Sequence, residues 1–199
     1  FCTNDIKRLK PGNGCEALVT NVKGRILAHL FVFATDTAVW IEAGPGEDAS
    51  LVAHFDRYLF NEDVQLRGRT AEYGELFLSG PDSGDVLSRW CPGACSLESL
   101  QHVMCEHAGQ RLVIRRLDLL ESRGYLLSME RAKLVDLWNG LLSEGATPCG
   151  AEAFHAARIE AGFPVYGLDL NEDNLAQEAA RTERAISFTK GCYLGQEPI

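Results

Sequence analysis

Short runs of hydrophobic residues, separated by turn-forming residues, dominate the first third of the chain and indicate β-strands. The runs EALVT at 16–20 and RILAHLFVFAT at 25–35 are joined by the tetrapeptide Asn21–Gly24, which is typical of a turn. The same pattern predicts strands at the following positions: 37–43, 63–70, 74–80, 111–120 and 124–130.

Elsewhere, apolar residues recur at intervals of three and four, which predicts amphipathic helices. The clearest helix is 131–145, whose predicted apolar face is Leu134, Val135, Trp138, Leu141 and Leu142. Helices are also predicted at 96–109, with Leu97, Leu100, Met104 and Ala108 on the buried side, and at 151–162.

Two further helices are predicted from their first residues. Asp48 is expected to cap a helix, and Gly80-Pro81-Asp82 is expected to start a short one. The apolar face of the first is expected to be Leu51, Val52, Phe55, Tyr58 and Leu59. Strands that follow strands directly, with helices interspersed, predict an α+β fold, and no linker divides the chain.

Composition and charge exclude several classes of function. Apolar residues make up 46% of the chain and charged residues 24%, as in globular proteins. No apolar run is long enough to cross a bilayer, so no membrane association is expected. With 28 acidic and 19 basic residues the net charge is −9, which disfavours direct binding to nucleic acid.

The chain contains seven cysteines at irregular spacings, which do not indicate a secreted disulfide framework. A reducing compartment is therefore expected. A zinc site is suggested by Cys91, Cys95, His102, Cys105 and His107, but their spacing lacks the usual tight pair. In a helix over 96–109, Cys105 and His107 would point to nearly opposite sides, so no metal site is expected.

Glu160 is predicted to lie at the edge of an apolar stripe on the helix 151–162. A carboxylate removed from water needs hydrogen-bond donors or a charged partner. A salt bridge to Arg158 or to another arginine would satisfy it. A bound ligand with a flat edge of N–H donors, such as a pterin, would satisfy it equally well.

Cys192 stands in the segment KGCYLGQE at 190–197, between two glycines and two residues after Lys190. A single cysteine is more often a packing residue than a reactive one. Flexible glycines and a nearby ammonium group, however, favour an accessible thiolate. If GQEPI opened a helix, the positive end of that helix would stabilise the thiolate further.

These segments resemble a known family. RIEAGFPVYGLDL, ISFTKGCYLGQE and LWNGLLSEGATPCG are similar to segments of the YgfZ-type folate-binding proteins, relatives of the glycine-cleavage T-protein, an aminomethyltransferase. TNDIKRLKPGNG, TNVKGRILAHLFVF and HFDRYLFNEDVQL resemble the same family, so that the resemblance covers essentially all of residues 1–199. The KGCYxGQE block is its most specific part.

The resemblance implies a fold of ferredoxin-like lobes arranged around a central folate-binding channel. Family members have a strand and a helix before TND and a C-terminal β-barrel after GQE, so residues 1–199 are expected to be one folate-binding domain of a longer chain. The implied catalytic residues are Cys192 and Lys190. The residues expected to contact tetrahydrofolate or a one-carbon derivative are Glu160, Tyr166, Tyr193, Gln196 and Glu197.

One departure from the family bears on activity. Aminomethyltransferases carry an acidic pair in the strand after their first glycine turn, and the matching positions here are Ala28 and His29. Transfer from a methylated amine needs a nearby carboxylate to handle a proton and developing charge. Alanine cannot supply one, and histidine differs in pKa and shape. Whether the chain is an enzyme is therefore open.

The resemblance implies a role in assembling or repairing iron–sulfur enzymes, including those that modify tRNA, with iron–sulfur proteins or their assembly factors as partners. Two alternatives stay open: a folate-dependent aminomethyltransferase, and an interaction scaffold with a vestigial folate pocket. The expected compartment is the cytoplasm for a bacterial-type protein, or the mitochondrial matrix if the source is eukaryotic.

Overall fold

The computed structural model describes residues 1–199, which form two compact units. The first unit contains residues 1–68 and 164–199, and the second contains residues 69–163. Each unit combines helices with an antiparallel sheet, which confirms the prediction of a mixed fold with strands that follow one another directly. The ferredoxin-like lobes and the central channel stay predictions.

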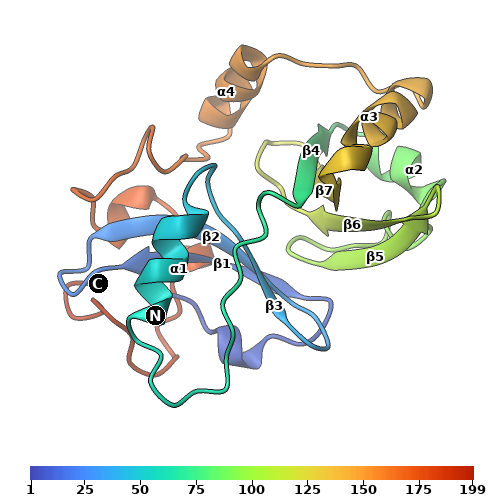
Figure 1. The fold of residues 1–199 in the computed structure, drawn as a ribbon. Helices are drawn as coiled ribbons and strands as arrows, with labels where there is room; N and C mark the ends of the chain where they lie inside the picture. Colours follow the sequence, from blue (N-terminus) through green and yellow to red (C-terminus); the bar gives the residue numbers. More distant parts are fainter. The chain divides into compact units, whose positions relative to one another are not determined.

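The first unit contains a three-stranded antiparallel sheet in the order β1-β2-β3 (Figure 1). Its strands are β1 (Gly14–Thr20), β2 (Ile26–Ala34) and β3 (Val39–Glu42). The predicted turn Asn21–Gly24 joins β1 to β2, and the Gly24 N–H donates to the Asn21 carbonyl over 3.0 Å. The strands predicted at 16–20, 25–35 and 37–43 are thus confirmed.

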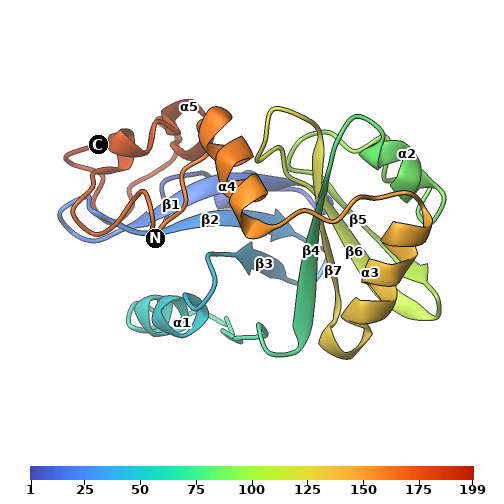
Figure 2. The ribbon, with the colours of Figure 1, turned by 90° about the horizontal axis from the view of Figure 1, so that it is seen from above.

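Strand β1 is buried on both faces because a different part of the unit covers each face (Figure 2). Ala17 and Val19 pack with Leu51 of helix α1 (Asp48–Asp56). Leu18, on the opposite face, packs with the segment that contains η3 (Ala176–Ala179) and α5 (Thr182–Ala185). A short helix, η1 (Ile6–Arg8), precedes the sheet.

The second unit contains a four-stranded antiparallel sheet in the order β4-β7-β6-β5. Its strands are β4 (Tyr73–Ser79), β5 (His102–His107), β6 (Gln110–Arg116) and β7 (Gly124–Glu130). Its helices are α2 (Ser83–Ser88), η2 (Arg131–Lys133), α3 (Leu134–Ser143) and α4 (Ala151–Glu160). Residues of α2 and α3 share one core with β6 and β7. No helix in either unit is long and apolar enough to cross a membrane.

The helix predicted at 96–109 is wrong, because residues 102–107 form strand β5. Ala108 and Gly109 have φ values of 51° and 72°, and they form the two-residue loop of a hairpin in which His107 pairs with Gln110. Positive φ at both loop positions matches the twist of paired strands, so the hairpin prevails over the helical spacing of the apolar residues. Met104, predicted to be buried, is 42% exposed.

This correction changes the argument about metal binding. In a strand, Cys105 and His107 lie on the same side, so the helix geometry no longer separates them. No group of three or more His, Cys, Asp or Glu side chains in the structure could hold a metal ion.

Two other predictions, both for residues between 48 and 70, are also corrected. Residues 63–70 are not a strand of either sheet, and nearly all of them are exposed. Helix α1 has Glu47, and not Asp48, as its N-cap residue, and it ends at Asp56. The predicted apolar residues Tyr58 and Leu59 therefore lie beyond the helix.

The buried face of α3 matches the predicted one at Leu134 and Leu141 but differs at the other predicted positions. Leu137 and Leu141 are buried in the core, whereas Val135 is 68% exposed. Trp138 and Leu142 are 40% and 39% exposed. The sequence contains two apolar stripes on this helix, and only packing against the sheet selects the stripe that contains Leu137.

We expect Leu137→Ala to lower the free energy of unfolding of the second unit by about 2–5 kcal/mol, because it leaves a cavity in a closed core. Val135→Ala, on the exposed side of the same helix, should change it by less than about 0.5 kcal/mol. Urea denaturation followed by circular dichroism measures both. Equal effects of the two substitutions would contradict the assignment of the buried face.

Candidate functional site

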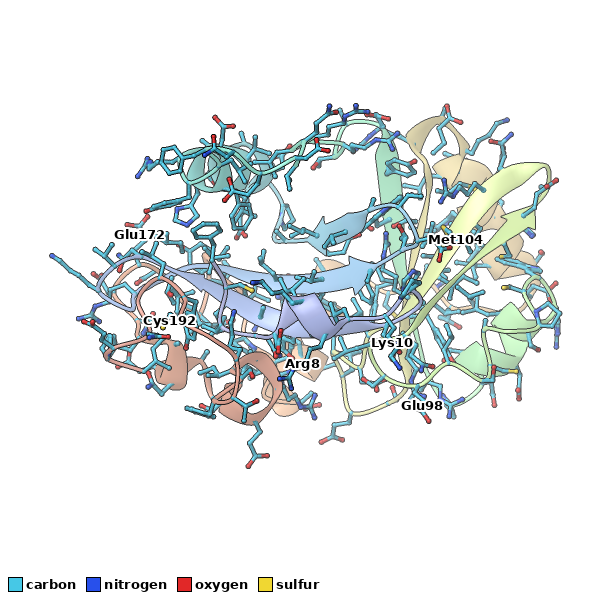
Figure 3. All side chains as sticks on the ribbon, turned by 90° about the horizontal axis from the view of Figure 1, so that it is seen from below. Arg8, Lys10, Glu98, Met104, Glu172 and Cys192 are labelled. Atoms are coloured by element: carbon cyan, nitrogen blue, oxygen red, sulfur yellow. The ribbon has the colours of Figure 1, made fainter.

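The segment KGCYLGQE forms an irregular loop in the first unit, and Cys192 is exposed there (Figure 3). The loop is fixed at its far end by contact with the turn between β1 and β2. Gly195 has a φ of +79°, and a Cβ atom built on it would lie 2.1 Å from the Asn21 carbonyl oxygen. Only glycine combines this conformation with so close an approach. The second glycine of the motif, Gly195, is therefore required by this close contact.

The hydroxyl of Thr20 provides a second attachment for the loop. It donates a hydrogen bond of 2.6 Å to the Leu194 carbonyl. Within the loop, the Tyr193 N–H donates to the Gln196 Oε1 atom over 3.1 Å. Gln196 therefore stabilises the loop that carries Cys192. Residues 195–199 themselves are not helical.

The ammonium group of Lys190 is engaged by the N-terminal segment. Its Nζ atom donates to the carbonyls of Cys2 and Asn4 over 2.6 and 2.9 Å, and it lies 4.9 Å from the centroid of the Tyr193 ring. The sequence had indicated Lys190 as a charge that stabilises the Cys192 thiolate. Its observed hydrogen bonds go instead to two backbone carbonyls.

The accessibility of the cysteines separates Cys192 from its neighbours in the first unit. Cys2 and Cys15 are buried, and burial raises the pKa of the Cys15 thiol to about 12. A thiol with such a pKa contains very little thiolate at neutral pH and is a poor nucleophile. Cys192 is the exposed thiol of this unit.

The other residues expected to contact folate in the first unit differ in exposure. Tyr193 and Tyr166 are half-buried, and burial raises the pKa of both phenols. The carboxylates of Glu172 and Glu47 raise the pKa of Tyr166 further. Glu197 is exposed.

Glu160 is the last residue of α4 in the second unit, and it is exposed rather than set in an apolar stripe. The buried residue of this helix is Arg158. Its guanidinium donates to His155 Nδ1 over 2.9 Å and to the Phe163 carbonyl over 3.1 Å. A salt bridge from Glu160 to Arg158 or to another arginine, one of the two partners considered for this carboxylate, stays a prediction.

A buried polar cluster in the first unit was missed by the sequence analysis. The carboxylate of Glu16, on β1, accepts hydrogen bonds of 2.6 Å from both Nε and Nη2 of Arg181. It also bonds to Nε2 of His29 over 2.7 Å. All three side chains are nearly inaccessible to solvent. The sequence does contain a signal for this cluster. Glu16 lies in an apolar run that forms a strand, and a buried carboxylate needs partners.

Electrostatics keeps Glu16 ionised. Burial acts to raise the pKa of this carboxyl, but the hydrogen bonds from His29 and Arg181 outweigh it and hold the pKa below its usual value. An ionised carboxylate only accepts hydrogen bonds, so Nε2 of His29 must carry the proton in this pair.

The two positions at which the family resemblance implies acidic residues face opposite sides of the sheet. Ala28 is 1% exposed and packs in the core beneath α1. His29 points to the other face and is bound to Glu16. Neither position supplies a carboxylate, and the histidine that replaces one is already hydrogen-bonded to an acid.

The fold up to the start of this loop belongs to a recognisable class of protein. Residues 1–190 match the model of the GCVT N-terminal domain, and the chain therefore belongs to that family. A crystal structure of the glycine cleavage system aminomethyltransferase T from Bartonella henselae has the same fold, with a TM-score of 0.79 and 22% identity. The match covers 92% of this chain and 50% of that one.

Two curated relatives are similar to this chain over almost all of its residues. An aminomethyltransferase of Rubrobacter xylanophilus is 26% identical over 198 residues, which cover 99% of this chain and 53% of the relative. A chloroplastic protein of Arabidopsis thaliana, provisionally named a transferase, is 26% identical over 199 residues, or 99% of this chain and 46% of the relative. The chain spans about half the length of these relatives. The YgfZ-type subgroup stays a prediction.

The ion pair of Glu16 predicts a specific dependence of stability on pH. Because its pKa is lowered on folding, its contribution is complete above the unfolded pKa of about 4.3 and is lost as the pH falls through the folded value. We expect Glu16→Gln, which leaves Arg181 without its counter-charge, to cost roughly 3–5 kcal/mol at pH 7.

Thermal or urea unfolding at several pH values measures this effect. The difference between the wild type and Glu16→Gln should shrink as the pH falls below about 4. Glu183→Gln, at an exposed position of α5, serves as the matched control and should have little effect at any pH. A difference that stays constant down to pH 2 would show that Glu16 does not act through its charge.

Proposed function

We propose that this protein binds tetrahydrofolate or a one-carbon derivative and acts, like YgfZ-type proteins, through Cys192 in the assembly or repair of iron–sulfur enzymes, including tRNA-modifying ones. The observation that carries the proposal is the exposure of Cys192 in a loop held by Gly195, Thr20 and Lys190. An exposed thiol in a loop fixed on both sides is suited to contact with a partner protein. Its iron–sulfur partners come from the family resemblance.

The folate part of the proposal depends on Glu160. Its carboxylate is exposed and can accept two parallel N–H donors of a pterin edge. Tetrahydrofolate, when bound, would supply one-carbon carrier chemistry. The chain's own contribution would be to recognise the pterin through Glu160. Tyr166, Tyr193, Gln196 and Glu197, which belong to the first unit, stay predictions from the family resemblance.

An aminomethyltransferase is the second candidate, and the names of the curated relatives favour it. Against it stand Ala28, which is packed in the core, and His29, which is bound to Glu16. In this chain a proton from a methylated amine would have to be taken up by His29 or by a group elsewhere. The thiol-based function needs no such group.

A calorimetric titration of tetrahydrofolate into the full-length protein tests the folate part. We expect saturable binding that Glu160→Gln weakens by about tenfold or more, because a charge-assisted hydrogen bond contributes roughly 1.5–3 kcal/mol. Glu152→Gln, in the first turn of the same helix and also exposed, is the control and should bind normally. No binding to any of the three proteins would sink the folate assignment.

The role of Cys192 is tested by reactivating an iron–sulfur enzyme whose cluster has been damaged. Wild-type protein should accelerate recovery, and Cys192→Ser should lose most of this effect, because serine cannot hold sulfur or iron or form a mixed disulfide. Cys149→Ser, which removes an exposed thiol of the second unit, should behave as the wild type. Turnover of a methylated amine donor by the Cys192→Ser protein would instead favour the transferase.

A further inference from the structure

Thr3 connects β1 to the segment that precedes the Cys192 loop, and it uses all of its polar groups to do so. Its N–H donates to the Leu18 carbonyl over 2.9 Å, and its hydroxyl accepts from the Leu18 N–H over 2.8 Å. In the other direction, the hydroxyl donates to the Ala185 carbonyl over 2.5 Å, and the Thr3 carbonyl accepts from the Ser187 N–H over 2.9 Å. Thr3 itself is completely buried.

Asn4 makes a parallel connection one residue further on. Both hydrogen bonds come from its side-chain amide, which donates to the Glu16 carbonyl over 2.8 Å and to the Arg184 carbonyl over 2.9 Å. The two neighbouring side chains therefore bridge the same strand to the same stretch of chain, residues 184–187. Such a repeated bridge between segments distant in sequence fixes their relative position.

Lys190 completes this set of contacts from the side of the loop. Its ammonium group donates to the carbonyls of Cys2 and Asn4, the residues on either side of Thr3. Two of its three N–H donors are thus used on the backbone of residues 2–4. The lysine is half-buried there and is separated from Cys192 by a single glycine.

We infer that the hydrogen bonds of Thr3, Asn4 and Lys190 together anchor the Cys192 loop. Lys190 then acts on Cys192 by fixing the backbone of the loop rather than as a charge beside the thiol. This inference rests on the proposed function in assigning Cys192 the chemical role. Thr3 and Asn4 are positioning residues for that cysteine, although they lie near the opposite end of the sequence.

These anchoring contacts account for the conformation of the loop, which is fixed at both ends. Lys190 holds the beginning of the loop on residues 2–4, and Gly195 holds its end on the turn between β1 and β2. The intervening Gly191 has no atom within 4 Å of the position that a Cβ would take, and Cys192 is exposed. The thiol is therefore presented at the centre of a short span fixed at both ends.

The test uses the full chain with Cys95→Ser and Cys149→Ser, so that Cys192 is the remaining exposed cysteine. Lys190→Met removes the hydrogen bonds and the charge, whereas Thr3→Val removes the bridging hydroxyl and leaves the charge in place. Hydrogen exchange of residues 187–195 reports the order of the loop, and the pH midpoint of Cys192 alkylation by iodoacetamide reports the thiol.

We expect both variants to accelerate exchange in the loop by about tenfold or more, because each removes an anchor against local opening. Lys190→Arg and Thr3→Ser, which keep the donors, should restore slow exchange. The alkylation midpoint should move by less than about half a pH unit in Thr3→Val and in Lys190→Met alike. Asn4→Ala replaces Thr3→Val should the latter fail to fold.

The opposite pattern would overturn the inference. If Lys190→Met raised the midpoint by about one unit or more and left loop exchange unchanged, Lys190 would act as a charge on the thiol. Unchanged exchange in both variants would show that residues 2–4 do not hold the loop. Neither readout involves folate or an iron–sulfur partner, so failure here is distinct from failure of the proposed function.

Discussion

The buried carboxylate of Glu16 is the constraint on which the first unit depends. It lies in a strand covered on both faces, and such a charge is tolerated only when its partners neutralise it and satisfy its oxygens. Arg181 supplies two parallel hydrogen bonds and His29 supplies a third. Because Arg181 follows the second unit in the sequence, this pair also joins the two parts of the chain that form the first unit.

The same segment leads directly into the loop of Cys192. Residues 181–187 are held on β1 by the ion pair and by the bridges of Thr3 and Asn4, and the Cys192 loop continues directly from them. Burial is needed for the anchors, whereas exposure is needed for the thiol. The chain meets both needs within a dozen residues, because hydrogen bonds to the backbone and the close contact of Gly195 hold the loop without covering Cys192.

Membership of the GCVT N-terminal domain family gives the fold, and departures from the aminomethyltransferases bear on the reaction. The positions implied for acidic residues hold Ala28 in the core and His29 in a pair with Glu16. A histidine bound to a buried carboxylate is oriented and polarised by it. Neither position therefore offers the free carboxylate that the family resemblance implies there.

The sequence by itself determined the strands at 16–20, 25–35, 111–120 and 124–130, in outline, because alternation and turn residues are local signals. It also singled out the loop of Cys192 through its glycines and lysine. Tertiary structure decided that residues 102–107 are a strand, since pairing with β6 outweighed helical spacing. It likewise selected the buried stripe of α3 and brought Arg181 and Thr3 to β1, because such contacts depend on chain segments far apart in sequence.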